Sequence, residues 1–211
     1  MRKNIIAGIL LSLLSVAPSF AQSNANDVAA LNQRVAQLEK QVAEISQLLE
    51  PMRAQQAADA RRKVLREKFN QRNAADRAKH TQEQLREAEG LYQVANQKWG
   101  TSEATESLQA MIQKYPDINR TGCAVLYVAQ MSKGDDRAKN LQDCIEKYND
   151  CMYGDGVQVG AYARYLLMFD CRSNGDIKKA DELASEIKDK FSDAVDHSGN
   201  LLVDNLKAEP K

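Results

Sequence analysis

Three glycines divide the C-terminal half of the chain into pairs of amphipathic segments. Gly100 is followed by Gly134 after 34 residues and by Gly175 after a further 41. Apolar residues recur at helical spacing on both sides of each glycine. Because glycine accepts the backbone conformation in which helices end, this pattern predicts three helix–turn–helix hairpins. The stripes are Ala88, Leu91, Tyr92, Ala95 and Trp99, then Ala104, Leu108, Met111, Ile112 and Tyr115; Val125, Leu126 and Ala129, then Ala138, Leu141, Ile145 and Tyr148; and Val159, Tyr162, Ala163, Leu166 and Phe169, then Ala180, Leu183, Ala184, Ile187 and Phe191.

A helical hairpin that recurs after 34 residues is typical of tetratricopeptide (TPR) repeats. A small residue such as Ala104 early in the second helix lets the two helices approach closely, and Pro116 ends that helix. The longer second interval places an insert at residues 149–156. Residues 87–206 are therefore predicted to form a TPR-like α-solenoid of three hairpins, with a capping helix that contains Leu201, Leu202 and Leu206. The predicted fold class is all-α.

Residues 27–50 carry an uninterrupted heptad repeat of apolar residues, which is typical of a coiled coil. A stripe this narrow cannot be buried by a lone helix, so it predicts self-association as a parallel trimer or, alternatively, a dimer. The other interpretation is an amphipathic helix that packs on the chain's own globular part. The predicted oligomerisation residues are Val28, Leu31, Val35, Leu38, Val42, Ile45 and Leu49.

The segment that follows, residues 51–86, is predicted to be a charged helical linker. Pro51 is expected to end the heptad seam and could begin a new helix. Residues 61–68 contain five basic residues and one acidic residue. We interpret this run as a solvated helix between two modules, and a patch for an anionic polymer or lipid headgroups is the alternative.

The N-terminus has the pattern of a secretory signal peptide over residues 1–21. Arg2 and Lys3 precede an apolar run, and Ser19 and Ala21 provide small residues at the −3 and −1 positions. We therefore expect export to the periplasm without a stable membrane anchor. Without Arg2 and Lys3, the 29 basic residues become 27, against 29 acidic ones. This balance offers no basic field for nucleic acid.

The four cysteines are expected in an oxidising compartment. Cys123 and Cys144 face each other across the Gly134 turn, but packed helix axes lie about 8–10 Å apart and a disulfide needs Cα atoms within about 4.4–6.8 Å. The irregular insert can fold back toward the start of the hairpin. We therefore predict a disulfide between Cys123 and Cys151, with Cys144 and Cys171 as buried thiols.

No catalytic or metal-binding constellation is apparent in the chain. His80 and His197 are the only histidines. Asp196, His197 and Ser198 are adjacent, whereas a triad needs residues from separate elements, so this trio is interpreted as a helix cap. Cys144 and Cys151 have neither a CxxC motif nor a companion histidine. No enzyme activity, metal or cofactor is predicted, and an accessory to a peptidoglycan enzyme is a weaker alternative.

A binding surface is predicted on the first helix of each hairpin, which lines the concave face in TPR domains. Amides and phenols there suit an extended peptide, whose backbone needs both donors and acceptors. The predicted partner-binding residues are Gln93, Asn96, Gln97, Tyr127, Gln130, Gln158, Arg164 and Tyr165.

The layout of an exported chain with a heptad coil and three hairpins resembles the periplasmic cell-division coordinators associated with the Tol–Pal system (the CpoB or YbgF family). The stretch from Ala104 to Tyr115-Pro116 is similar to a hairpin of that family. The resemblance implies a trimeric coil and a TPR domain whose protein partners link peptidoglycan synthesis to outer-membrane constriction. The cysteine-bearing insert and the long charged helix depart from the family's layout. The expected function is a non-enzymatic scaffold or adaptor that binds envelope proteins, and a structural spacer of the envelope is the alternative.

Overall fold

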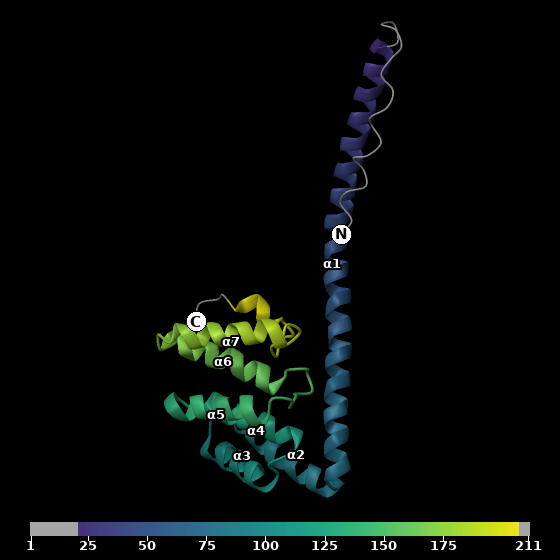
Figure 1. Ribbon diagram of the computed structural model, residues 1–211. Coiled ribbons are helices and arrows are strands. Elements are labelled where there is room, and N and C mark those ends of the chain that lie inside the picture. The colour runs from purple at the N-terminus through teal and green to yellow at the C-terminus, as the bar shows by residue number, and fades with distance from the viewer. Residues whose placement is uncertain (1–20, 207–211) are drawn as a thin grey trace. The chain divides into compact units, whose positions relative to one another are not determined.

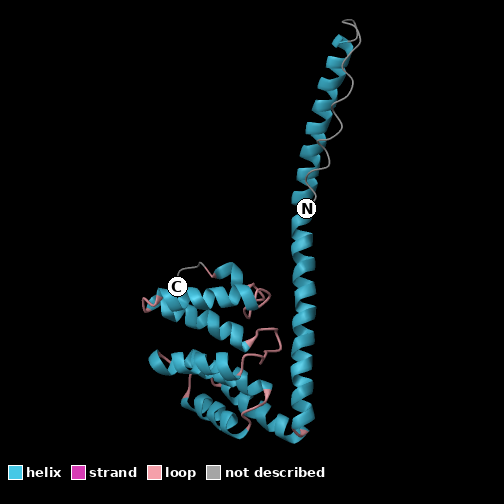
Figure 2. Cartoon of the chain, viewed as in Figure 1, coloured by secondary structure: helices cyan, strands magenta, loops and turns pink. Residues whose placement is uncertain are grey.

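The structure is a computed structural model that describes residues 21–206, with side chains described from Val28 onward. Within this range the secondary structure is helical and contains no strand, so the prediction of an all-α fold is confirmed (Figures 1 and 2). Residues 1–20 of the predicted signal peptide lie outside the described residues. The helices are α1 (Ala21–Lys79), α2 (Gln82–Gln97), α3 (Ser102–Lys114), α4 (Asn119–Met131), α5 (Gly134–Lys147), α6 (Val159–Ser173), α7 (Ile177–Lys190) and the short 3-10 helix η1 (Leu202–Asn205).

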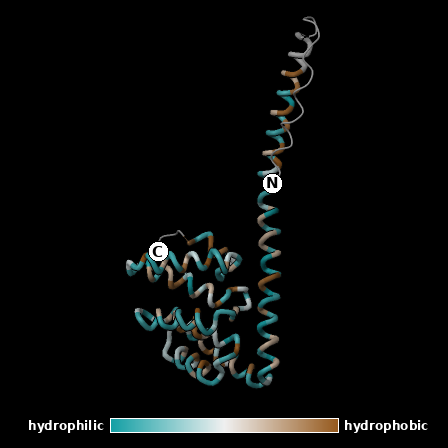
Figure 3. The backbone as a smooth tube through the Cα atoms, viewed as in Figure 1, coloured by the Kyte–Doolittle hydropathy of each residue, from teal (hydrophilic) through white to brown (hydrophobic). Residues whose placement is uncertain are grey.

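The chain divides into two compact units, residues 1–56 and 57–211, and α1 contributes to both. In the first unit the predicted heptad residues are exposed, and their exposed fractions range from 37% for Leu49 to 61% for Leu31 and Val42. Figure 3 shows the apolar residues recurring along this part of α1. The seam therefore has no partner within its own unit among the described residues.

Pro51 does not end the helix, contrary to the sequence-based prediction, because α1 continues through it. Proline removes one backbone hydrogen bond but keeps a φ angle that a helix accepts. Strong helix formers on both sides carry the helix onward. The exposed seam consequently extends three residues beyond Leu49 to Met52, which is 60% exposed.

Within the segment predicted as a linker, residues 51–86, residues 57–79 belong to the same unit as the hairpins. Leu65 is buried against Met152 and Val195. Lys68 Nζ lies 3.0 Å from Asp193 Oδ2. This segment has too few apolar residues to show an apolar stripe in the sequence, but Leu65 belongs to a second, small core cluster.

Asp76 ties the end of α1 to the start of α4. Its carboxylate is 5% exposed and accepts hydrogen bonds from the Arg72 guanidinium and, at 2.8 Å, from the backbone N–H of Asn119. The Asn119 side chain in turn donates to the carbonyl of Met152 at 2.8 Å and accepts from its N–H at 2.7 Å. Since a buried carboxylate needs such partners, this network fixes the insert beside α1 and α4.

Three helix pairs, α2 with α3, α4 with α5 and α6 with α7, form at the positions that the glycines predict. Gly100 and Gly175 occupy the turns of the first and third pair with φ angles of 78° and 80°, which favour glycine. The apolar stripes meet in one continuous core, except at Trp99 and Ala138, which are exposed. After α7, Leu202 and Leu206 are buried on the last pair, although the predicted capping helix is only the four-residue η1.

Candidate functional site

The first helices of the three pairs form one layer. Helix α2 contacts α4, and α4 contacts α6, whereas the second helices α3, α5 and α7 make no comparable contact with one another. The second helices are therefore splayed apart and the first helices are drawn together. We call the surface of this layer, with the rings that the insert and the final loop add to it, the aromatic face.

Trp99, Tyr127 and Tyr92 begin the aromatic face. The ring of Trp99 meets that of Tyr127 edge-on with a centroid distance of 4.2 Å, and Tyr127 lies 5.7 Å from Tyr92. The Tyr127 hydroxyl donates to the carbonyl of Ala95 at 3.2 Å, which locks α4 to α2. Trp99 is nevertheless 50% exposed. This end of the face thus presents a rigidly supported indole to solvent.

A second series of rings covers α6. Tyr153 of the insert and His197 of the final loop meet at a centroid distance of 4.9 Å, and His197 lies 5.3 Å from Tyr162. Tyr162 stacks on Tyr165 at 6.0 Å, and Tyr165 meets Phe169 edge-on at 4.9 Å. Tyr162, Tyr165 and Phe169 are partly exposed, so the series is open to a ligand.

Two ion pairs lie close to these rings. Asp155 Oδ2 lies 2.7 Å from His197 Nδ1, and Arg137 Nε donates to Asp170 Oδ2 at 2.6 Å. Burial raises the pKa of Tyr162 and Tyr165, with a further contribution from Asp196, so these phenols stay protonated donors at neutral pH. The face can therefore recognise a ligand through stacking and through neutral hydrogen bonds.

The predicted binding residues divide into two groups. Tyr127 and Tyr165 lie within the ring series. The amides Gln93, Asn96 and Gln97 are exposed on α2, and Gln130 is partly buried on α4. Gln93 Nε2 donates to Glu89 at 2.6 Å and accepts from Asn96 at 3.4 Å, so these side chains form a polar ladder along α2. These residues are placed where a ligand on the first helices would meet them.

Arg164 corrects the prediction, because its side chain is buried and holds helices together, whereas Gln158 stays partly exposed. Arg164 is 8% exposed and donates to Glu186 at 2.8 Å and to Asn149 Oδ1 at 2.8 Å. Gln158 donates to the carbonyl of Asn149 at 3.1 Å. Both residues contact Asn149, just beyond the end of α5. Their positions in the sequence relative to Tyr162 and Tyr165 did not indicate this contact.

Sequence reasoning assigned Trp99 and Phe169 to packing stripes and missed Tyr153 and His197. His197 was interpreted as part of a helix cap, but no helix begins there and its ring belongs to the aromatic face. The only signal in the sequence was Trp99 itself, a large aromatic residue directly before a turn glycine. The contacts of Tyr153 and His197 bring together loops 42 residues or more apart and leave no local pattern.

All four cysteines are buried free thiols in the structure, and the predicted bond between Cys123 and Cys151 is not formed. The insert does return to the start of α4, since a Cβ added to Gly122 would lie 2.6 Å from the sulfur of Cys151. Cys123 Sγ instead donates to the carbonyl of Met152 at 3.5 Å. Burial raises the pKa of the Cys123 and Cys144 thiols, so both are protonated and unreactive in this state.

Within the described residues 21–206, no group of three or more His, Cys, Asp or Glu residues is arranged to hold a metal ion. None of the helices in this range combines the length and the apolar character that crossing a bilayer requires.

Comparisons with protein-family models, with curated proteins and with solved structures found no match to this chain, so the interpretation of the aromatic face follows from its own geometry.

Proposed function

We propose that this protein is an exported, non-enzymatic adaptor that self-associates through α1 and binds extended segments of protein partners on a TPR-like hairpin module. The observation that carries the proposal is the aromatic face, in which exposed or partly exposed rings lie in the turn after α2, on α4 and on α6. Aromatic residues supply large contact areas with few rotatable bonds, which is why they dominate protein interfaces. The amide ladder beside them supplies donors and acceptors for a peptide backbone.

Self-association is supported by the exposed seam of the first unit. Seven heptad residues and Met52 are between 37% and 61% exposed along one helix. A helix of this length that leaves its apolar stripe in water is stabilised by pairing with identical helices. We propose a parallel trimer, with a dimer as the alternative. The resemblance to the Tol–Pal-associated coordinators supports a trimer and a periplasmic location near the division site.

The alternative function is a structural spacer of the cell envelope. A spacer needs a solvated surface and gains nothing from exposed aromatic rings. The partly exposed rings of the aromatic face therefore favour the adaptor over the spacer.

Partner capture tests the adaptor. The full chain is used as bait in an envelope extract, with photocrosslinking, and is compared with the double variant Trp99→Ala and Tyr165→Ala. Losing two central aromatic contacts is expected to reduce capture of the same partner at least about tenfold. Ile177→Ala is the matched control, because Ile177 is an apolar residue that is 54% exposed on the second helix α7. Equal capture by the double variant and the control would refute the binding site.

Sedimentation equilibrium tests self-association. Replacing Leu31 and Leu38 by Asp puts charges into the seam and should convert the oligomer into a monomer with an unchanged helical spectrum in residues 57–206. The control replaces the exposed residues Gln33 and Gln41, which lie off the seam, by Asp. An oligomer that survives the seam substitutions would place the contact elsewhere.

A further inference from the structure

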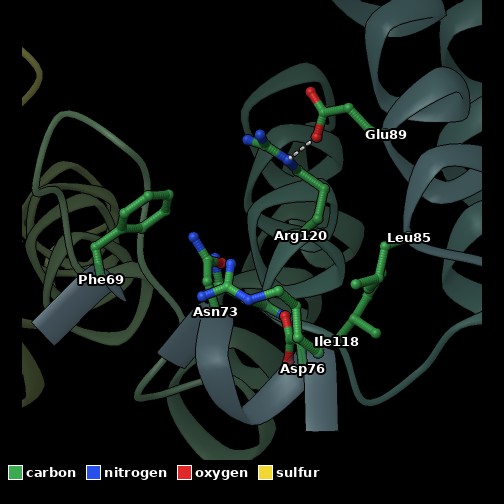
Figure 4. A pocket seen from close by; sticks show the side chains of 9 residues that line it. Phe69, Asn73, Asp76, Leu85, Glu89, Ile118 and Arg120 are labelled. Atoms are coloured by element: carbon green, nitrogen blue, oxygen red, sulfur yellow. Dashed lines mark hydrogen bonds and ion pairs between the residues drawn. The ribbon is translucent and has the colours of Figure 1, made fainter. Parts of the chain in front are cut away.

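A cavity of about 220 Å³ lies between the end of α1 and the starts of α2 and α4 (Figure 4). Its apolar wall comes from one residue of each neighbouring segment, Phe69, Leu85 and Ile118. Its polar lining is Asn73, Asp76, Arg77, Glu89, Asn119 and Arg120. We call this hollow the α1 cavity. It uses helix α1, which the predicted partner-binding residues do not include.

The carboxylates of the α1 cavity are already engaged. Asp76 accepts from Arg72 and from the N–H of Asn119. Glu89 accepts from Arg120 Nε at 2.7 Å and from Gln93 at 2.6 Å. Both anions thus have strong donors, and neither is left to attract a cation.

The donors of the α1 cavity are, in contrast, largely free. The side chains of Asn73 and Arg77 form no hydrogen bond or ion pair with the rest of the described residues 28–206. Arg120 uses only Nε in a hydrogen bond within this range, and its guanidinium lies over the Tyr92 ring at 4.6 Å, which fixes its position. Free N–H groups of two arginines and one amide therefore line a cavity with an apolar wall. This combination fits an anion that carries an apolar group.

We infer that the α1 cavity binds the C-terminal residue of a protein partner, with its terminal carboxylate on Arg77, Arg120 and Asn73 and its apolar side chain against Phe69, Leu85 and Ile118. Guanidinium groups recognise carboxylates through charge-assisted hydrogen bonds. Ligand pockets typically measure about 300–1,000 Å³, so a cavity of about 220 Å³ suits one terminal residue.

Other carboxylates fit less well. An internal Asp or Glu carries the charge but brings no apolar group to the wall. A free amino acid carries an ammonium group, which needs an acceptor, whereas Asp76 and Glu89 are both engaged. The inference goes beyond the proposed function and does not rest on the aromatic face, although Arg120 adjoins both sites.

The test uses four small probes on the full chain, with binding followed by ligand-observed NMR titration. N-acetyl-leucine represents a C-terminal residue, and N-acetyl-leucinamide is the same molecule without the carboxylate. Free leucine and N-acetylglutamic acid α-amide represent the free amino acid and the acidic side chain. We expect N-acetyl-leucine to bind at least about tenfold more tightly than each of the other three, because a hydrogen bond to a charged group contributes about 1.5–3 kcal/mol.

Variants assign the site. Arg77→Ala should weaken N-acetyl-leucine binding at least about tenfold, since it removes a charged donor. Arg66→Ala is the matched control, because Arg66 is an exposed arginine on the same helix and does not line the cavity. Arg77 is itself exposed, so its replacement should leave the helical spectrum unchanged.

Four results would overturn the inference: no saturable binding of N-acetyl-leucine below about 10 mM, equal binding of the amide, equal binding of free leucine or of the glutamate derivative, and equal loss in the two arginine variants. Failure of the aromatic-face variants to reduce partner capture would leave this result untouched, so the two proposals fail separately.

Discussion

Replacing Gly160 by alanine should destabilise the hairpin unit, because α6 begins in close contact with the end of α5. A Cβ added to Gly160 would lie 2.4 Å from Asn149 Oδ1, 2.7 Å from its Cα and 2.8 Å from its carbonyl oxygen. Two of these three atoms belong to the backbone and cannot rotate away. Alanine there must separate the second helix pair from the third.

The magnitude follows from three contributions. Alanine favours a helix over glycine by about 1 kcal/mol. Overpacking of a tight contact costs about 1–3 kcal/mol. The shift of Asn149 also weakens the hydrogen bond that Arg164 Nη1 donates to Asn149 Oδ1 at 2.8 Å, and a bond with a charged donor contributes about 1.5–3 kcal/mol. The net loss in the free energy of unfolding should be about 1.5–5 kcal/mol.

Gly90 is the matched control. It lies inside helix α2, is exposed, and has no atom within 4 Å of an added Cβ. Only the helix propensity acts there, so Gly90→Ala should stabilise the unit by about 1 kcal/mol.

Urea unfolding measures both changes through the fluorescence of Trp99, the single tryptophan of the chain, which lies in the hairpin unit. With slopes of about 1–3 kcal/mol per M, Gly160→Ala should lower the midpoint by about 1 M or more, and Gly90→Ala should raise it. If Gly160→Ala behaves like Gly90→Ala, the close approach between α5 and α6 does not exist.

Leu65→Ala should destabilise the hairpin unit by about 2–4 kcal/mol, because Leu65 is 4% exposed and its truncation leaves a cavity beneath α1. The same fluorescence assay measures this loss, and an unchanged stability would show that α1 does not pack at Leu65. Burial opposes ionisation of Asp155, but the favourable contacts of its carboxylate, chiefly the hydrogen bond with His197, outweigh burial and lower the pKa of Asp155. The pair therefore stabilises the fold at pH values above the unfolded pKa of about 3.9. This contribution is lost as the pH falls through the lower pKa of the folded state. Asp155→Asn should therefore flatten the decline in stability below about pH 4, and an unchanged acid profile would argue against the pair.

The positions of the helices could be predicted from the sequence. The stripes around Gly100, Gly134 and Gly175 predicted three helix pairs, and the structure has all six helices there. The heptad repeat lies within a helix, α1, and the self-association that it predicts stays a prediction. These features are local, because helical periodicity records which side of a segment avoids water. Tyr127 and Tyr165 could be placed on the aromatic face by the same periodicity.

The partners of each face were decided by the tertiary structure. Residues 57–79 look like a solvated linker in sequence, yet Asp76 is buried because its acceptor oxygens meet the N–H of Asn119, 43 residues away. Arg164 looked free for a ligand but is held by Glu186 and Asn149. His197 joins the aromatic face through rings of the insert and of α6. The apolar periodicity of a segment predicts which side of a helix is buried. The role of a polar or aromatic residue, in contrast, depends on side chains that are distant in sequence and that only folding brings into contact.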